Sequence, residues 1–101
     1  MEKRKPTYDL DAFKAAFRSP SSLKLTGAAL LGARQLGMGR EGIAEVIRAM
    51  ERLHFFKSMT SYEDHTVWQD VYHIPWRDLT VYLKFTADRI TSFRILSFKE
   101  R

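Results

Sequence analysis

The spacing of apolar residues changes near His54, and this change restricts the fold more than any other feature of the sequence. Before His54, apolar residues recur every three or four positions, which is typical of amphipathic helices. After it, apolar and polar residues alternate, and aromatic and β-branched residues accumulate, which is typical of strands. Helices followed by consecutive strands with short connections predict an α+β domain, in which the helices pack on one face of a mainly antiparallel sheet.

We predict a single domain over residues 1–101, because a chain of this length provides one hydrophobic core. Residues 1–53 are expected to be mostly helical and residues 54–101 to form the sheet. Helix caps and helix breakers divide the first half into about three helices. These are a helix that starts after Asp9 or Asp11 and ends before Pro20, a helix from Ala28 to Leu36 capped by Thr26 and ended by Gly37, and a helix that starts near Arg40.

Four strands are expected in the second half, and Pro75 is expected to interrupt the connection between the second and the third. Their ranges are Phe55–Met59, Thr66–Tyr72, Leu79–Thr86 and Ile90–Phe98. Alternate residues of a strand point to opposite faces of the sheet. Strict alternation therefore places Phe55 and Lys57 on the same face of the sheet, and likewise Ile95 and Lys99.

The third strand gives the clearest division between a buried and an open face. Its alternate residues Leu83 and Phe85 belong to a continuous apolar face, so Tyr82 must point the other way. If the helices cover the apolar face, the open face gathers a phenol and several cations, namely Lys57, Tyr82, Lys84 and Lys99. Positive charge combined with groups that stack on bases is typical of surfaces that bind single-stranded RNA. The same lysines are also consistent with a solvated face that only keeps the protein in solution.

The net charge agrees with a polyanionic partner. The chain has 17 Lys and Arg against 12 Asp and Glu, a formal charge of +5, which favours RNA, DNA, an acidic protein or an anionic membrane surface. The absence of cysteine excludes disulfides, thiol nucleophiles and cysteine-ligated metal sites. The histidines His54, His65 and His73 lack the spacing of metal ligands. We therefore expect neither a metal nor a cofactor.

The sequence predicts a cytoplasmic protein without a membrane segment. The basic run Lys3–Lys5 is followed by Pro6 and polar residues where a signal peptide would have an apolar core. No apolar stretch approaches the roughly 18 residues that a membrane-spanning helix needs. The basic start is interpreted as a solvated, frayed terminus.

The segment Phe56–Tyr72 closely resembles the corresponding block of the MqsR toxins, the motility quorum-sensing regulators of bacterial toxin–antitoxin pairs. The segments Val81–Lys84 and Ser97–Arg101 and the start Met1–Arg4 match the family as well. This resemblance implies a RelE-like fold and sequence-specific cleavage of messenger RNA, with a preference for GC-containing triplets. It also implies a partner, an MqsA-like antitoxin that binds DNA and carries its own zinc.

The resemblance also implies which residues act. The catalytic positions of the family fall on Lys57, Gln69, Tyr82 and Lys99, and Met59 falls on a substrate contact. Lys84, on the open face beside Tyr82, is the second expected substrate contact.

Metal-free cleavage of RNA by its own 2′-hydroxyl needs a proton acceptor, a proton donor and positive charge for the phosphorane. We expect Lys57 and Lys99 to stabilise the phosphorane, one of them also donating a proton, and Gln69 to orient phosphate or ribose. Clustered lysines should lower a lysine pKa and favour the tyrosinate form of Tyr82, which would accept the 2′ proton.

The remaining acidic residues in this region, Glu63, Asp64 and Asp70, are interpreted as structural or solubilising. His65, next to the turn, is interpreted as a hydrogen-bonding residue at the entry to a strand. Two other functions stay open on the sequence. One is a basic module that binds RNA or protein without cutting, and the other is a sheet whose edge is extended by a partner strand.

Overall fold

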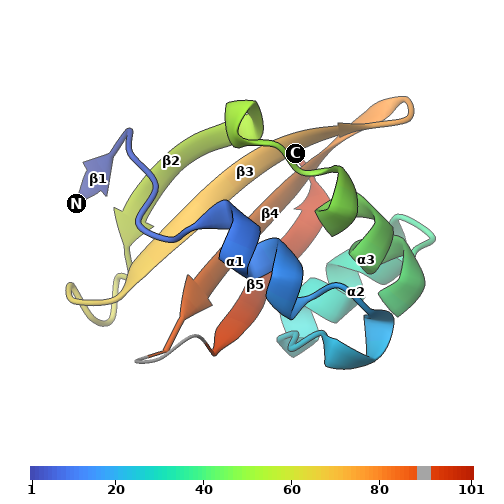
Figure 1. Cartoon of the computed structure of the whole chain (residues 1–101), viewed down its shortest axis with the longest axis horizontal. Helices are drawn as coiled ribbons and strands as arrows, with labels where there is room; N and C mark the ends of the chain where they lie inside the picture. The colour runs from blue at the N-terminus through green and yellow to red at the C-terminus, as the bar shows by residue number, and fades with distance from the viewer. Residues whose placement is uncertain (89–91) are drawn as a thin grey trace.

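The computed structural model describes residues 1–88 and 92–101, and it places three α-helices on one side of a five-stranded sheet (Figure 1). The helices are α1 (Leu10–Ala16), α2 (Gly27–Gln35) and α3 (Arg40–Ala49), with 3-10 turns η1 (Pro20–Ser22) and η2 (Arg52–His54). The strands are β1 (Glu2–Lys3), β2 (Phe55–Thr60), β3 (Trp68–Trp76), β4 (Leu79–Ala87) and β5 (Phe93–Glu100). They follow one another in chain order across the sheet, and every neighbouring pair is antiparallel. The predicted α+β architecture is confirmed.

Local sequence signals set the helix ends. The Asp9 side chain accepts a hydrogen bond from the Asp11 amide at 2.9 Å, and the Thr26 hydroxyl accepts one from the Ala29 amide at 3.1 Å. Each cap satisfies an amide at a helix start that has no partner within the helix. Gly37 follows α2 with a φ of 75°, a conformation that favours glycine. The three predicted helices are confirmed: α1 begins after Asp9, α2 differs from the expected range by one residue at each end, and α3 begins at Arg40.

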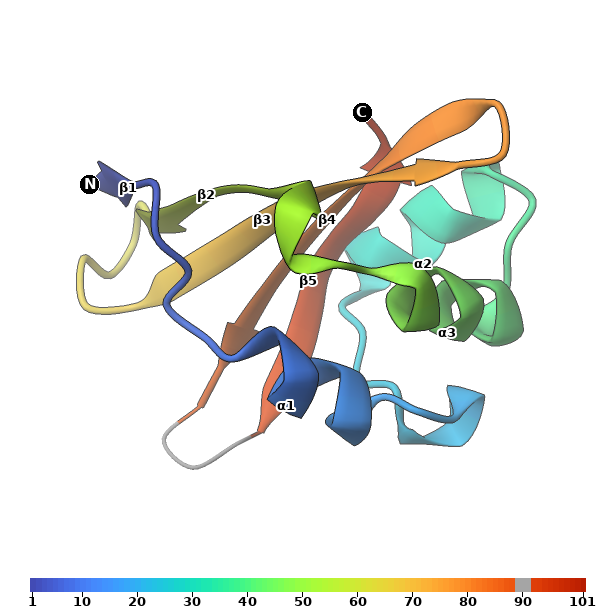
Figure 2. The same cartoon turned by 45° about the horizontal axis from the view of Figure 1, so that its top comes forward.

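The helices lie on one side of the sheet (Figure 2), and the hydrophobic core is formed by residues of these helices and of the strands. Phe13 of α1 stacks on Phe85 of β4, with ring centroids 3.8 Å apart. Helix α2 lies so close to β5 that a Cβ placed on Gly32 would come within 2.1 Å of the Phe98 carbonyl oxygen. Among the described residues, no helix covers the outer face of the sheet.

The start of the chain is a strand, and the expected frayed terminus is wrong. Glu2 and Lys3 of β1 lie opposite Met59 and Ser58 of β2. The Lys3 ammonium also lies 4.1 Å from the centre of the Trp68 ring. Two residues are too few to show alternation in the sequence. They form a strand because the edge of β2 that faces away from β3 is available for backbone pairing.

β3 is longer than predicted and contains Pro75. Pro75 lies opposite Thr80 of β4, and the chain reverses only after it, near Arg77, whose φ is 57°. The pairing of β2 with β3 ends at Phe55 and Tyr72, so β3 has one neighbour beyond that point. A residue without an amide proton is tolerated on the unpaired side of a strand, which explains why Pro75 does not break β3.

Two bulges overturn strict alternation. The register between β4 and β5 shifts next to Lys84 and Phe85, which leaves Leu96 as an extra residue. Ile95 consequently points into the core while Lys99 lies on the open face, although alternation groups the two together. A similar shift in β2 separates Phe55, which packs against the core, from Lys57. Of the predicted fourth strand, Ile90 and the next residue lie outside the described residues.

In the part of the chain that the structure describes, no helix is long and apolar enough to cross a membrane.

Candidate active site on the open sheet face

Three rows of side chains cross the strands on the open face of the sheet. Residues opposite one another in an antiparallel pair point to the same side, so the register defines these rows. The first row contains Glu2, Met59 and Gln69, the second contains Lys57, Val71, Lys84 and Ser97, and the third contains His73, Tyr82 and Lys99. All six side chains predicted for the site lie on this face.

A groove of about 660 Å³ opens at the first row. Its walls are the first strand, the turn between β2 and β3, and part of the second row. The residues that matter for the site are Glu2, Met59, His65, Gln69 and Lys84. His65 is exposed in the turn and faces this groove, whereas the sequence suggested a hydrogen-bonded residue entering a strand. The groove therefore joins three predicted site residues, Met59, Gln69 and Lys84, to one that was not considered, Glu2.

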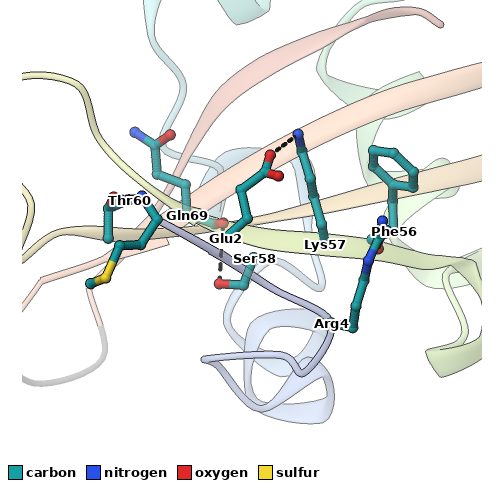
Figure 3. A network of polar contacts seen from close by, with 8 residues as sticks. Glu2, Arg4, Phe56, Lys57, Ser58, Thr60 and Gln69 are labelled. Atoms are coloured by element: carbon teal, nitrogen blue, oxygen red, sulfur yellow. Dashed lines mark hydrogen bonds and ion pairs between the residues drawn. The ribbon is translucent and has the colours of Figure 1, made fainter.

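Glu2 and Lys57 form an ion pair in which the Lys57 ammonium donates a hydrogen bond to Glu2 Oε1 (Figure 3). The Lys57 side chain is 24% exposed and the Glu2 side chain 60% exposed, so both remain accessible to a ligand. The hydrogen bond and the positive charge of Lys57 lower the pKa of Glu2. Glu2 is therefore an ionised carboxylate at neutral pH, on a face that is otherwise rich in cations.

His73 is, after Glu2, a second ionisable side chain on the open face that was not predicted for the site. Its ring stacks on Phe56 with centroids 4.3 Å apart, and it lies 5.7 Å from the Tyr82 ring centre. Burial lowers the pKa of His73, and the charges of Arg101 and Lys57 lower it further. The imidazole is consequently neutral at pH 7. Its position in the third row was hidden because a lone histidine in a strand carries no motif.

The expected tyrosinate form of Tyr82 is wrong. Burial raises the pKa of Tyr82, and the nearby charge of Lys57 opposes this only in part. The side chain is thus a neutral phenol, which can donate a proton but is a poor acceptor. The Lys99 ammonium lies 5.2 Å from its ring centre. The expected lowering of a lysine pKa is found at Lys84, where burial and the charge of Lys99 both act.

The structural interpretation of the other carboxylates agrees with their contacts. Asp70 is fully buried on the helix side of β3 and accepts hydrogen bonds from the amides of Thr7 and Tyr8 at 2.9 to 3.1 Å. Asp64 accepts bonds from the amide and hydroxyl of Thr66 at 2.9 and 2.6 Å, which shape the turn. Glu63 is exposed in that turn.

Metal ligands do not converge on this face or elsewhere in residues 1–88 and 92–101, where no group of three or more His, Asp or Glu side chains could hold an ion. His54, for example, uses its Nδ1 to accept a hydrogen bond from the Glu51 amide at 3.0 Å. The groups that remain for chemistry are cations in the second and third rows, a carboxylate in the first and a phenol in the third. Such a set can neutralise a phosphodiester and transfer protons beside it.

Comparison with known proteins identifies the family. The family model described as "Motility quorum-sensing regulator, toxin of MqsA" matches residues 5–100. The chain is also 42% identical over 101 residues to the mRNA interferase toxin MqsR of Escherichia coli strain K12, with 100% of both chains covered. The chain therefore belongs to the MqsR toxin family.

Proposed function

We propose that this protein is the toxin of a toxin–antitoxin pair and that it cuts messenger RNA on the open face of its sheet. Its relative in Escherichia coli is named an mRNA interferase toxin, and the match covers the whole of both chains. The observation that carries the proposal is the placement of Lys57, Tyr82 and Lys99 in adjacent rows of one helix-free face. An RNA strand laid across these rows would meet cations for its phosphates and a phenol for proton transfer.

The proposed reaction uses the 2′-hydroxyl of the RNA as the nucleophile and needs no metal. Attack on the adjacent phosphate gives a 2′,3′-cyclic phosphate and a 5′-hydroxyl end. Lys57 and Lys99 stabilise the charge of the phosphorane, and Gln69 orients the phosphate or ribose through its amide. Met59 and Lys84, which line the groove, contact the substrate.

Tyr82 takes a different role from the one expected on the sequence. Because its phenol is neutral, we assign it to donate a proton to the 5′ oxygen as that group leaves. An alkoxide is a much stronger base than a phenolate, so this transfer is favourable even though burial raises the pKa of Tyr82.

The family resemblance supports a proposal for the partner and for the cleavage specificity. The matched family is described as the toxin of MqsA, so we propose an MqsA-like antitoxin as the partner, one that binds DNA and holds its own zinc. We also propose cleavage at GC-containing triplets. Because messenger RNA is translated in the cytoplasm, this function places the chain in that compartment.

Growth of bacteria that produce the protein tests this function. Production without an antitoxin should arrest growth and shorten messenger RNA, and co-production of the antitoxin should restore both. A Lys57→Ala protein, made in equal amount, should be harmless. The alternative, a basic module that binds RNA without cutting, predicts salt-sensitive RNA binding and intact transcripts. Normal growth with abundant folded wild-type protein would contradict the proposed function.

A further inference from the structure

The proposed reaction leaves one role on the open face without an occupant, the acceptor of the 2′ proton. Lysine side chains carry ammonium groups at neutral pH and cannot accept a proton in that form. Tyr82 is a neutral phenol, and Asp70 is buried on the other face with its oxygens bonded to backbone amides. Within the three rows, two groups with a free electron pair remain, the Glu2 carboxylate and the His73 imidazole. Glu63 and His65 also line the groove, but they lie in the turn between β2 and β3, outside the rows that hold the lysines and Tyr82.

We propose that Glu2 is the catalytic proton acceptor of this site, and that its carboxylate takes the proton of the attacking 2′-hydroxyl. This role rests on the proposed function as an RNA-cutting enzyme. It follows from the position of the carboxylate, which pairs with Lys57 (Figure 3) and lines the groove. Glu2 lies in the first row together with Gln69, the residue assigned to orient phosphate or ribose.

The strand that carries Glu2 is fixed on the sheet. The Thr60 amide donates a hydrogen bond to the Met1 carbonyl at 2.9 Å, and the Met1 amino group donates one to the Thr60 hydroxyl at 2.9 Å. On the other side of Glu2, the Lys3 ammonium lies over the Trp68 ring. The backbone that carries Glu2 is thus held on both sides of the residue, and Lys57 contacts the carboxylate itself, as the positioning of a base requires.

The order of the rows suits an in-line displacement, in which the attacking and leaving oxygens lie on opposite sides of phosphorus. Successive rows are two residues apart along the strands, or about 7 Å. A phosphate on Lys57 and Lys84 of the second row therefore has Glu2 on one side and Tyr82 on the other. His73 lies in the third row beside Tyr82, on the side of the leaving oxygen.

The proton and bond changes balance with these two groups. The 2′ oxygen forms its bond to phosphorus as its proton passes to a carboxylate oxygen of Glu2. The bond between phosphorus and the 5′ oxygen breaks, and that oxygen takes the phenol proton of Tyr82. The carboxyl group of Glu2 then loses its proton, and the phenolate of Tyr82 regains one, by exchange with water.

The charged groups around Glu2 keep the carboxylate ionised and ready to accept a proton. They are Lys57 on β2, Arg4 in the segment after β1, and the amino group of Met1. All three are cationic and lower the pKa of Glu2, so protonation of Glu2 reduces cleavage only in the acid range. A phosphate that binds Lys57 competes with Glu2 for the ammonium and leaves the carboxylate free for the 2′-hydroxyl.

Glu2→Gln is the decisive variant, because it keeps the shape of the side chain and removes the electron pair that accepts the proton. Cleavage of a short defined RNA is measured under single-turnover conditions across pH. Binding is measured with the matching 2′-deoxy oligonucleotide, which cannot be cut. The matched control is Glu45→Gln, which removes a similar charge from an exposed position of α3.

We expect Glu2→Gln to cleave about 10² to 10⁴ times more slowly than wild type. Binding should be unchanged or tighter, because the substitution removes a negative charge from the phosphate-binding face. The decline of the wild-type rate at acid pH should be absent from the residual activity of the variant. Glu45→Gln should match wild type in both measurements.

Three results would overturn the role of Glu2 while leaving the proposed function intact. The first is faster or unchanged cleavage by Glu2→Gln, which would mean that the carboxylate only occupies the Lys57 ammonium when no RNA is bound. The second is an equal loss of binding and cleavage, which would make it structural. The third is that the decline of the cleavage rate at acid pH persists in Glu2→Gln and disappears in His73→Gln, which would make His73 the proton acceptor. A wild-type protein that leaves the RNA uncut would instead overturn the proposed function itself.

Discussion

Lys57 and Glu2 are separated by 55 positions in the sequence and form an ion pair on the open face of the sheet. The contact links a residue predicted to be catalytic to a strand that the sequence did not predict. It also brings a carboxylate to a face for which the sequence predicts lysines and a tyrosine. The charges of this face are therefore mixed, with Glu2 at one edge of the cationic rows.

Replacement of Lys57 should remove activity and leave the fold intact. We expect Lys57→Ala to cut RNA at least about 10² times more slowly, because the phosphorane loses its closest cation. Exposed ion pairs are weakened by solvent and contribute little to the free energy of unfolding, so urea denaturation should change little. Lys24→Ala, in the segment before α2, is the matched control and should keep wild-type cleavage. Retained cleavage in Lys57→Ala would remove this residue from the mechanism.

Replacement of Tyr82 should separate chemistry from binding. Tyr82→Phe removes only the hydroxyl, so the RNA affinity should stay within about threefold of wild type while the cleavage rate falls about 10² to 10⁴ times. Because burial raises the pKa of Tyr82, any alkaline decline of the wild-type rate that is caused by this phenol should lie above the ordinary value of 10 for tyrosine. A decline well below pH 10 that disappears in Tyr82→Phe would show a lowered pKa and contradict this assignment.

Loss of the Asp70 carboxylate should destabilise the fold. Asp70→Ala leaves the amides of Thr7 and Tyr8 without their acceptor inside the protein. Unsatisfied buried groups and lost bonds to a charged acceptor cost about 1 to 3 kcal/mol. The free energy of unfolding, measured with urea, should fall by about that amount. An unchanged value would mean that the segment before α1 is not held by Asp70.

The contact between α2 and β5 predicts different effects on stability when two glycines of this helix are replaced by alanine. Gly32→Ala would force a methyl group against the Phe98 carbonyl and should cost about 1 to 3 kcal/mol. Gly27→Ala has no atom within 4 Å of the added group and should leave stability unchanged or slightly higher. Thermal unfolding of the two variants checks this difference. Equal melting temperatures would contradict the close packing at Gly32.

His73 should make stability depend on pH. The pKa of His73 in the folded protein lies below the ordinary value of 6.5. As the solution becomes acidic, the unfolded chain therefore binds more protons than the folded protein does. The stability that His73 provides is therefore present above pH 6.5 and lost as the pH falls through its folded pKa. The difference in free energy of unfolding between wild type and His73→Gln should shrink over this range. A difference that grows toward acid pH would show a raised pKa.

Local signals predicted the helical half and the faces of the central strands. Thr26 and Gly37 mark the ends of α2 because capping depends on neighbouring residues. In β4, regular pairing with β3 preserves alternation, so Tyr82 and Lys84 lie on the expected face. The sequence therefore predicted the scaffold of the site and the placement of Lys57, Tyr82, Lys84 and Lys99 on the open face, whereas Gln69 was indicated only by the family resemblance.

The features that were missed depend on contacts between distant segments. The bulges beside Phe55 and at Leu96 arise from the register of one strand against another, which no single segment encodes. β1 is only two residues long and forms because β2 has a free edge. Glu2 was overlooked for the same reason, although the match of Met1–Arg4 to the family was a signal that the start of the chain is ordered.

Mapping of the 5′ ends of a defined transcript after incubation with the purified wild-type protein, in the presence of EDTA, tests the central claim most directly. The account predicts new 5′-hydroxyl ends at a small set of GC-containing triplets, with 2′,3′-cyclic phosphates on the upstream fragments. Lys57→Ala should give none of these ends at matched protein concentration. A transcript that stays intact while the wild-type protein binds it would contradict the account and identify the open face as a binding surface only.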